Sequence, residues 1–391
     1  MGVTIPLSEF KARITRLQAE MKKDGFDAIL AYGNEAEPQY VRYLSDYWPS
    51  FETAGVIVPA EGEPMLLIGP ESYTYAADRS VIPEIRLLKA FRESSEPEYP
   101  GKPLSTFNSV FDEVMGGRKI TKFGVAGLPL MTIGVYTDLA ASLKEYGNIE
   151  ILKADDVMAR LRMIKTEPEL ACMREAARIT RETFDYVLNN IKPGMTECQV
   201  AGLALGKMHE LGAERESYPL WVLTGEGSNQ AISRPRHKII QPGDMTFLQI
   251  GARVAGYAST IGRPVIFGKA TEEQKSLIAA GYAGQKIVCE TLKAGVCAGD
   301  VAAAYENEME KIGYKDWLLY GPCHGNGQME GEAPWIENGS TWILQENMSF
   351  CVDIFLGNND KKIGLRMEDV VRVTKDGVEN LTNYPREVFE L

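Results

Sequence analysis

The side chain with the most chemical potential is His324, which lies in the glycine-flanked run Gly321-Pro322-Cys323-His324-Gly325-Asn326-Gly327. The chain has three histidines, and small residues on both sides of this one leave the imidazole uncovered on a predicted turn. Such a histidine can serve as an acid, a base or a metal ligand. A lone histidine on a turn is usually structural. Here two acidic residues, Asp353 and Glu368, follow in the sequence, each within a predicted strand. Their presence favours a chemical role for His324.

Three polar side chains interrupt apolar runs that predict strands. Gln249 lies within 245–252, Asp353 within 348–355 and Glu368 within 365–373. Buried polar groups need hydrogen bonds, and buried carboxylates need partners. Any one of these residues alone could mark the end of a strand. Because the three stand near matching points of a repeat, we expect them to face one cleft.

Two cysteines accompany the candidate residues. Cys323 precedes His324, and Cys351 stands two residues before Asp353, so strand alternation places Cys351 and Asp353 on one face. A Cys–His nucleophile pair is one interpretation. A buried, unreactive thiol is the other, and it is favoured because neighbours on a turn usually point apart.

An internal repeat supplies the elements that position these residues. Ile191-Lys192-Pro193-Gly194-Met195 and Leu292-Lys293-Ala294-Gly295-Val296 each precede a predicted helix, at an offset of 101 residues. The strands that carry Gln249 and Asp353 recur at nearly the same offset. Two copies of a unit of helices and strands predict a pseudo-twofold fold with a cleft between the halves.

The region before the repeat predicts a separate α/β domain over residues 1–155, followed by a second domain over 156–391. Its pattern indicates a helix at 8–24 ended by Gly25, a strand at 28–31 and a hairpin within 52–68. Further strands are expected at 123–126 and 150–152. A helical connection over 155–190 is broken near Lys165, and Thr166 caps its second helix.

Composition limits the classes of function. The chain has 391 residues and a net charge of -12, which argues against nucleic-acid and membrane partners. Six scattered cysteines without CxxC spacing predict neither a disulfide framework nor a zinc knuckle. There is no secretory pattern and no apolar run of membrane-spanning length, so we expect a cytoplasmic protein with a small-molecule substrate.

Several motifs together resemble one family. They are Leu161-Arg162-Met163-Ile164-Lys165, Gly243-Asp244 before a strand, Gly256-Tyr257-Ala258-Ser259 followed by Arg263, and Arg366-Met367-Glu368-Asp369. The arrangement resembles the pita-bread fold of creatinase, prolidase, aminopeptidase P and methionine aminopeptidase over nearly the whole chain. The resemblance implies an α/β (α+β) architecture: a creatinase/prolidase-type N-terminal domain, then a pita-bread catalytic domain. It also implies a homodimer.

The resemblance further implies where a two-metal site would lie. Peptidases of this family bind two ions through Asp, Asp, His, Glu and Glu, which fall here on Gln249, Thr260, His324, Asp353 and Glu368. Gln and Thr are neutral and cannot help to bridge two divalent ions. The family histidine before Glu332 falls on Gly331. The sequence therefore predicts that no cofactor is bound. The alternative is one Mn, Co or Zn ion held by His324, Asp353 and Glu368.

The resulting hypothesis is a creatinase-like hydrolase that cleaves a C–N bond in an amino-acid-derived substrate. His324 would transfer protons beside Asp353 and Glu368. The candidate substrate-binding residues are Arg263, Arg366, Gln249, Thr260, Tyr257 and Glu332. Three alternatives stay open: an Xaa-Pro dipeptidase-like enzyme with one divalent ion, a lyase acting on a betaine-like compound, and a non-catalytic binding module.

Overall fold

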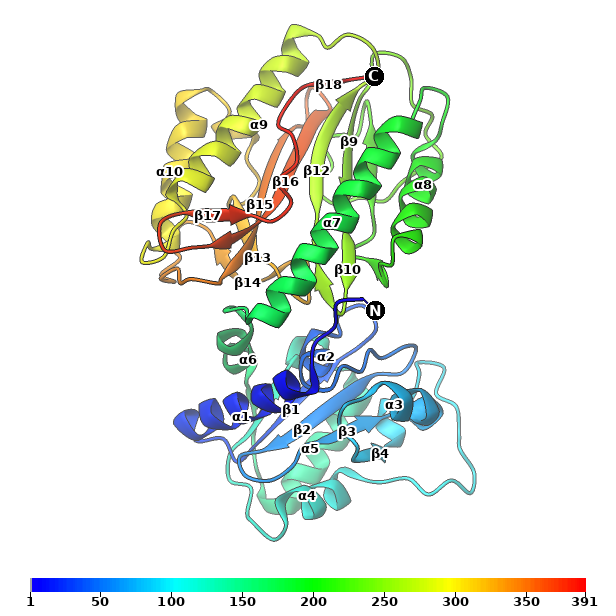
Figure 1. Cartoon of the computed structure of the whole chain (residues 1–391). Coiled ribbons are helices and arrows are strands. Elements are labelled where there is room, and N and C mark those ends of the chain that lie inside the picture. Colours follow the sequence, from blue (N-terminus) through cyan, green and yellow to red (C-terminus); the bar gives the residue numbers. More distant parts are fainter. Residues whose placement is uncertain (1) are drawn as a thin grey trace. The chain divides into compact units, whose positions relative to one another are not determined.

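The computed structural model describes residues 2–391, and Figure 1 labels their helices and strands. They divide into two compact units, Ile5–Arg162 and Met163–Leu391, the second of which includes residues 2–4. The sequence-based boundary at residue 155 falls at the start of helix α6 (Asp155–Arg162). The structure groups α6 with the first unit because Val157 and Met158 belong to the core of that unit. Among the described residues, no helix combines the length and apolar character needed to span a membrane.

The first unit is built on a six-stranded sheet in the order β4-β3-β2-β1-β5-β6. Its strands are β1 (Ala28–Gly33), β2 (Ala54–Pro59), β3 (Met65–Ile68), β4 (Ile85–Leu87), β5 (Phe123–Ala126) and β6 (Ile151–Lys153). Its helices, besides α6, are α1 (Leu7–Asp24), α2 (Gln39–Ser45), α3 (Tyr73–Arg79), α4 (Phe107–Met115) and α5 (Ile133–Gly147), with short 3-10 helices at Pro70–Ser72, Lys89–Phe91 and Leu128–Leu130.

Strand alternation gives this sheet two cores. Ile29 of β1 packs in one hydrophobic cluster, and its neighbour Leu30 packs in the other, so both faces of the sheet are covered. Helix α1 ends at Gly25, which adopts a left-handed φ of 73° that glycine tolerates best. The helix, strands and hairpin expected for this region are confirmed.

The second unit is built on a nine-stranded sheet whose main path is β14-β13-β15-β16-β12-β9-β8, with β17 on β16 and β18 on β12. These strands are β8 (Trp221–Thr224), β9 (Met245–Ile250), β12 (Ile261–Ile266), β13 (Cys323–Gly325), β14 (Glu332–Ile336), β15 (Ser349–Asn358), β16 (Ile363–Val373), β17 (Val378–Asn380) and β18 (Phe389–Glu390). A small sheet contains β7 (Arg215–Glu216), β10 (Ala252–Val254) and β11 (Tyr257–Ala258).

The helices of this unit repeat as the sequence predicts. They are α7 (Glu167–Asn190), α8 (Glu197–Glu210), α9 (Glu272–Thr291) and α10 (Ala298–Lys311), with a 3-10 helix at Lys315–Trp317. Helices α8 and α10 have 14 residues each, and from Glu197 to Ala298 the offset is 101 residues. Thr166 starts α7 in a capping box with Glu169, which confirms the expected cap. The expected α/β class and pita-bread architecture are confirmed.

The helices of this unit pack on one face of the large sheet. Leu248 of β9 and Ile261 of β12 share a core with Phe184 of α7 and Val200 of α8, and these helices lie over the sheet in Figure 1. Because successive residues of a strand point to opposite faces, Gln249 points away from the helices. The polar side chains that the sequence singles out within these strands therefore project from the opposite face, where they are buried.

Candidate functional site

Four neighbouring strands align candidate residues in one row across the sheet face opposite the helices. Asp353 of β15 is the direct partner of Glu368 of β16, Glu368 pairs with Gly262 of β12, and Gly262 pairs with Gln249 of β9. Directly opposed residues project from the same face of a sheet. A Cβ atom at Gly262 would lie 3.0 Å from the Glu368 backbone nitrogen, so a glycine at this position leaves room for Glu368. The structure therefore brings Gln249, Asp353 and Glu368 together on one face of the sheet.

His324 lies on a short strand rather than on the predicted turn. It belongs to β13 and pairs directly with Cys351 of β15. The backbone fits only because residue 325 is glycine: a Cβ atom there would lie 2.6 Å from the carbonyl oxygens of Glu332 and Ala333. The strand buries the imidazole, which is 5% exposed, so the expectation of an uncovered turn histidine is corrected.

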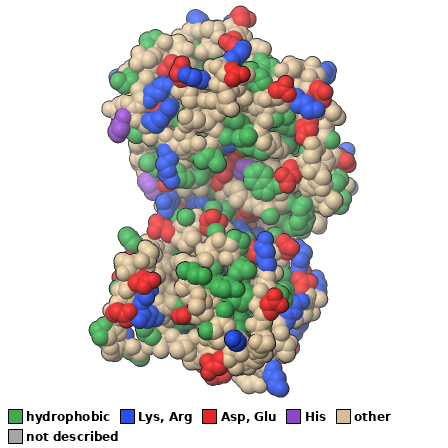
Figure 2. All heavy atoms as spheres, turned by 180° about the vertical axis from the view of Figure 1, so that it is seen from behind, with side chains coloured by type: hydrophobic (Ala, Val, Ile, Leu, Met, Phe, Trp, Pro, Cys, Tyr) green, Lys and Arg blue, Asp and Glu red, His purple; other side chains and the backbone are tan. Residues whose placement is uncertain are grey.

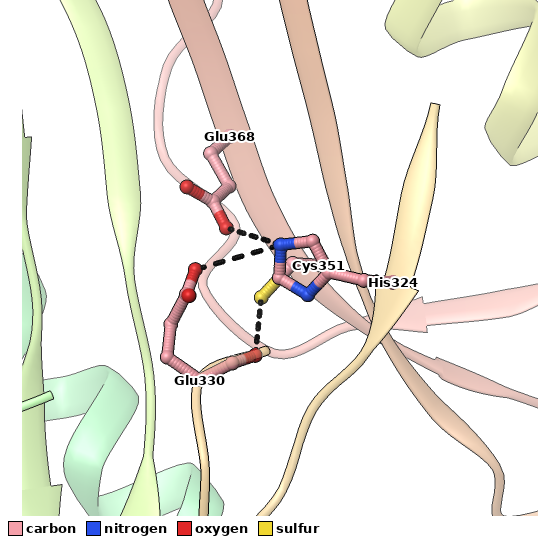
Figure 3. Close-up of side chains that lie close together, drawn as sticks. All are labelled: His324, Glu330, Cys351 and Glu368. Carbon is pink, nitrogen blue, oxygen red and sulfur yellow. Dashed lines mark hydrogen bonds and ion pairs between the residues drawn. The ribbon is translucent and has the colours of Figure 1, made fainter. Parts of the chain in front are cut away.

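The orientation of the His324 ring is fixed by its own strand. Nδ1 lies 3.1 Å from the Gly325 carbonyl oxygen, which can only accept, so Nδ1 carries the hydrogen. Nε2 then faces the acids, 3.7 Å from Glu330 Oε1, 3.9 Å from Asp353 Oδ2 and 3.9 Å from Glu368 Oε1. Figure 3 shows Glu330 and Glu368 both directed toward this ring nitrogen. In this tautomer, Nε2 offers a lone pair to a proton or a metal ion.

Glu330 is a member of the site that sequence reasoning missed. It lies in the loop between β13 and β14. A loop has no helical or strand periodicity from which the direction of a side chain could be predicted. The usable signal was its position just before Gly331, where the resemblance expects a histidine. A Cβ atom at Gly331 would stand 3.8 Å from His324 Nδ1, so this part of the loop borders the imidazole.

Glu368 carries the strongest electrostatic constraint. Its side chain is fully buried, and Gln249 Nε2 donates a hydrogen bond to Oε2. Within residues 2–391, Oε1 has no hydrogen-bond partner. Burial raises the pKa of the carboxyl well above its ordinary value, and the charges of Glu330 and Asp353 raise it further. A buried carboxylate oxygen with no donor, beside two other acids, is suited to binding a proton or a cation.

Arg366 supplies a resident positive charge beside these acids. Its Nε lies 3.2 Å from Asp353 Oδ1, Nη1 donates to Gln249 Oε1 at 3.3 Å, and Nη2 donates to the Tyr320 hydroxyl. The guanidinium also stacks over Trp221 at 4.5 Å. Burial alone would lower its pKa, but the charge of Asp353 raises it, so Arg366 stays cationic. Tyr320 donates to Asp353 Oδ2 at 2.8 Å, whereas Oδ1 has no hydrogen-bond partner within residues 2–391 and keeps only the ion pair with Arg366.

Thr260 borders the same site through Tyr218, whose hydroxyl lies 2.7 Å from Thr260 Oγ1. Burial, together with the charges of Glu368 and Glu330, raises the pKa of Tyr218 well above its ordinary value. Figure 2, which views the molecule from behind, shows a histidine and acidic side chains between hydrophobic groups on the second unit.

Tyr257 and Glu332 make structural contacts within the second unit. The Tyr257 hydroxyl donates to Glu169 Oε1 at 2.6 Å, next to the cap of α7. Glu332 pairs with Lys165 at 3.0 Å, and both side chains are almost fully buried. These contacts fix the start of α7 and the β13–β14 loop. Neither side chain is presented to the acid cluster, which consists of Glu330, Asp353 and Glu368 around His324.

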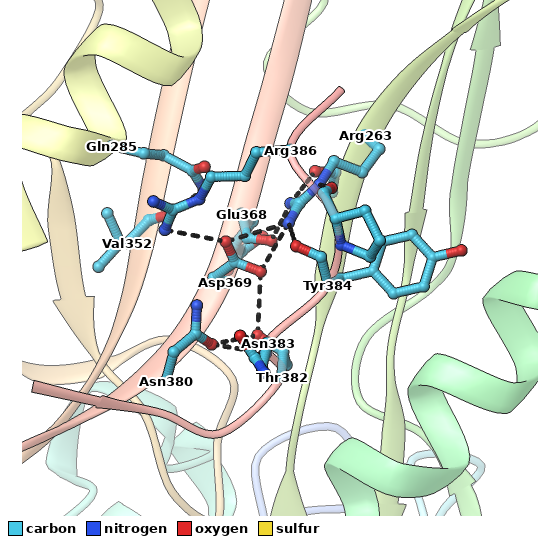
Figure 4. A network of polar contacts seen from close by, with 12 residues as sticks. Arg263, Gln285, Val352, Glu368, Asp369, Asn380, Thr382, Asn383, Tyr384 and Arg386 are labelled. Carbon is cyan, nitrogen blue, oxygen red and sulfur yellow. Dashed lines mark hydrogen bonds and ion pairs between the residues drawn. The ribbon is translucent and has the colours of Figure 1, made fainter. Parts of the chain in front are cut away.

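Arg263 lies on the other face of the sheet. Its partner is Asp369, which follows Glu368 on β16 and therefore points to the opposite face, and both side chains are 0% exposed. Arg263 donates to both carboxylate oxygens of Asp369 at 2.9 and 3.1 Å, and to the carbonyl oxygens of Tyr384 and Pro385 (Figure 4). The structure does not bring Arg263 to the acid cluster, because its guanidinium is used to hold the C-terminal segment.

The cluster contains a donor set that fits one metal ion. One donor atom each from His324, Glu330, Cys351 and Glu368 lies within 4.8 Å of the other three (Figure 3). A cation at this position would interact with the Glu368 oxygen that lacks a hydrogen-bond donor and with the lone pair on His324 Nε2. On the Gln249 side, the guanidinium of Arg366 already provides a positive charge, so the residues present do not fit a second ion there.

Comparison with known proteins agrees with this fold. The model of metallopeptidase family M24 matches residues 171–375, and that of the creatinase/prolidase N-terminal domain matches residues 13–164. The Xaa-Pro dipeptidase of Pyrococcus furiosus is 26% identical over 387 residues, which cover 97% of this chain and 100% of that protein. An uncharacterized peptidase of Bacillus subtilis, YqhT, is 27% identical over 278 residues, covering 70% of this chain and 77% of its own. A prolidase structure from Thermococcus sibiricus superposes with a TM-score of 0.84 at 25% identity, covering 98% and 99% of the two chains.

These matches overturn one expectation. The prediction that no cofactor is bound was wrong: the family model that matches is one of metallopeptidases, and four potential ligands converge in the structure. The error came from counting only the five family ligand positions. Two of these are lost in this chain, but Glu330 and Cys351 contribute donors from positions outside that set.

The family model covers more than half of the chain, and a relative and a solved structure align over nearly its full length. The predicted hydrolase family and the predicted N-terminal domain are therefore confirmed. The chain belongs to metallopeptidase family M24, a family of hydrolases, and carries a creatinase/prolidase-type N-terminal domain.

Proposed function

We propose that this protein hydrolyses a C–N bond in a small amino-acid-derived substrate of the Xaa-Pro dipeptide class, with one divalent metal ion per chain instead of two. The observation that carries the proposal is the division of the acid cluster into two parts. On one side, Glu368 Oε1 lacks a donor among residues 2–391 and faces His324 Nε2. On the other side, Arg366 pairs with Asp353 and Gln249.

The charges support a single ion. Gln249 and Thr260 are neutral, and Asp353 already has Arg366 and Tyr320 as partners. A second dication beside the Arg366 guanidinium would meet like-charge repulsion without a free carboxylate to offset it. His324 and Glu368 would hold the one ion, and Glu330 and Cys351 are the further donors within reach. A divalent ion bound there would polarise a carbonyl oxygen and lower the pKa of bound water.

The residues around the ion have separable roles. The Gly325 carbonyl holds His324 Nδ1–H, which keeps Nε2 directed at the cluster. Glu330 is the most exposed of the three acids at 18%, against 4% for Asp353 and 0% for Glu368. It is therefore the group best placed to accept a proton from water and return it to the leaving amine. Arg366 holds Asp353 and orients Gln249, which in turn donates to Glu368.

Metal content and substrate panels together test the proposal. Protein reconstituted with zinc, cobalt or manganese should contain one ion per chain, and His324→Ala should lose it. His237→Ala, which changes an exposed histidine outside the site, is the matched control. Xaa-Pro dipeptides should release free proline, whereas guanidino compounds, the creatinase-type alternative, would release urea. Two bound ions, or full metal retention in His324→Ala, would refute the single-ion site.

Two further outcomes separate the alternatives. Ligand-induced stabilisation without turnover across the panel would indicate a binding module, and an unsaturated product would indicate a lyase. The homodimer that the family resemblance predicts is tested by sedimentation of the full chain.

A further inference from the structure

Cys351 lies buried beside the acid cluster. It lies on β15, is 0% exposed, and is the direct strand partner of His324. Its side chain shares a face with Asp353 two residues later, as the alternation predicts. Its sulfur lies at the long distance of 3.8 Å from the Glu330 carbonyl oxygen and also contacts the Glu368 carboxylate. A thiol in this position contributes little to the fold through hydrogen bonding.

The spacing of the donors around Cys351 suits a small metal ion. Its Sγ lies within 4.8 Å of the donor atoms of His324, Glu330 and Glu368. Among these donors, His324 Nε2 is 3.7 Å from Glu330 and 3.9 Å from Glu368. Tetrahedral ligation with zinc bonds of about 2.0–2.3 Å sets donors roughly 3.3–3.8 Å apart. The His324 pairs are thus already close to this spacing, and a donor pair at the 4.8 Å limit must approach by about 1 Å to close around an ion.

A second observation points to a ligand at the same place. Glu368 is fully buried, and within residues 2–391 its Oε1 lacks any hydrogen-bond partner while facing the imidazole and the thiol (Figure 3). A lone buried cysteine would not indicate a site. A cysteine, an oriented imidazole and an unsatisfied buried carboxylate oxygen that converge do indicate one.

We propose that Cys351 is a metal ligand, so that the ion is bound by the Cys351 thiolate, His324 and Glu368, and the site selects thiophilic ions such as zinc over manganese. This inference rests on the proposed single-ion hydrolase and names its metal class. Glu330, which lies in a loop and is partly exposed, then stays outside the ligand set and serves proton transfer.

The chemistry of the donors gives the reason for the selectivity. Thiolate and imidazole favour zinc, whereas manganese prefers carboxylate, carbonyl and water oxygens. The five-ligand set implied by the family resemblance has no sulfur donor. As the ion binds, a metal–sulfur bond replaces the S–H bond, and one proton passes to solvent. Three protein ligands also leave a position open for water or substrate, as catalytic zinc sites require.

Cobalt substitution tests the sulfur bond without any assay of activity. Wild-type protein loaded with Co²⁺ should show thiolate-to-cobalt charge-transfer absorption in the near ultraviolet. Cys351→Ser should lose that absorption, and Glu330→Gln should keep it. Cys323→Ser is the matched control, because Cys323 is equally buried and precedes His324 but points to the other face of the sheet. Circular dichroism confirms that each variant is folded.

Metal competition gives the second readout. Wild-type protein offered Zn²⁺ and Mn²⁺ together should bind Zn²⁺, and Cys351→Ser should lose more zinc affinity than the roughly 10–100-fold that loss of an outer partner costs. Cobalt bound without charge-transfer absorption in the wild-type protein would overturn the proposal even if the variant failed to fold. No ion bound in the wild type would instead refute the proposed single-ion function, so the two failures are distinguishable.

Discussion

Arg263 provides a direct test of whether the buried network of Figure 4 is structural. Replacing Arg263 with Ala would leave Asp369 fully buried without its bidentate partner. Removing one member of a buried ion pair costs about 3–5 kcal/mol of folding free energy. Arg386 lies 3.4 Å from Asp369 and would still offset part of the carboxylate charge. We therefore expect the free energy of unfolding to fall by about 3 kcal/mol. For a unit of this size, that loss lowers the Tm by roughly 6–12 °C.

Urea unfolding of the full chain, followed by circular dichroism, measures this free energy. The matched control is Arg386→Ala: its side chain is 32% exposed and makes the longer contact to Asp369, so the loss should stay under about 1 kcal/mol. The sequence-based expectation that Arg263 binds substrate makes the opposite prediction. Unchanged stability in Arg263→Ala together with a raised KM would refute the structural role.

Three further variants probe the site and the first unit. Gly325→Ala should destabilise the chain by about 1–3 kcal/mol and weaken metal binding, because its Cβ would overlap the carbonyl oxygens of Glu332 and Ala333; thermal melts and metal titration measure both effects. Glu330→Gln should lower kcat by about 10²–10⁴ while metal analysis still finds one ion, and loss of the ion would instead make Glu330 a required ligand. For Asp27, burial alone would raise the pKa, but hydrogen bonds from Thr121 and the Lys122 amide hold it below its usual range. The stability that wild type has over Asp27→Asn should therefore be present above about pH 4 and vanish as the pH falls through the lowered pKa; a difference that persists in acid would contradict this.

Local patterns determined much of the fold. Apolar spacing with Gly25 predicts α1, Thr166 predicts the start of α7, and the 101-residue offset predicts that α8 and α10 are equivalent. The ends of α1 and α7 depend on residues close in sequence, and the equivalence of α8 and α10 depends on the internal repeat. The family resemblance extended them to the arrangement of the sheet, and the row of Gln249, Asp353 and Glu368 followed from strand alternation.

The site was harder to predict from the sequence than the fold, because its residues come from distant segments of the chain. Glu330 lies in an aperiodic loop, so only the fold shows that it faces His324. His324 was expected on a turn, yet pairing with Cys351 makes it part of a strand. Arg263 was assigned to substrate by residue type, although its register places it on the opposite face beside Asp369. Residue type indicates available chemistry, and register decides which groups meet.

Anomalous X-ray diffraction from crystals of zinc-reconstituted protein, recorded on both sides of the zinc absorption edge, tests the single-ion site most directly. We predict one anomalous peak per chain within bonding distance of His324 Nε2 and Glu368 Oε1, with the Arg366 guanidinium still between Asp353 and Gln249. Two peaks in the acid cluster, or a peak bound through Asp353 with Arg366 displaced, would contradict it.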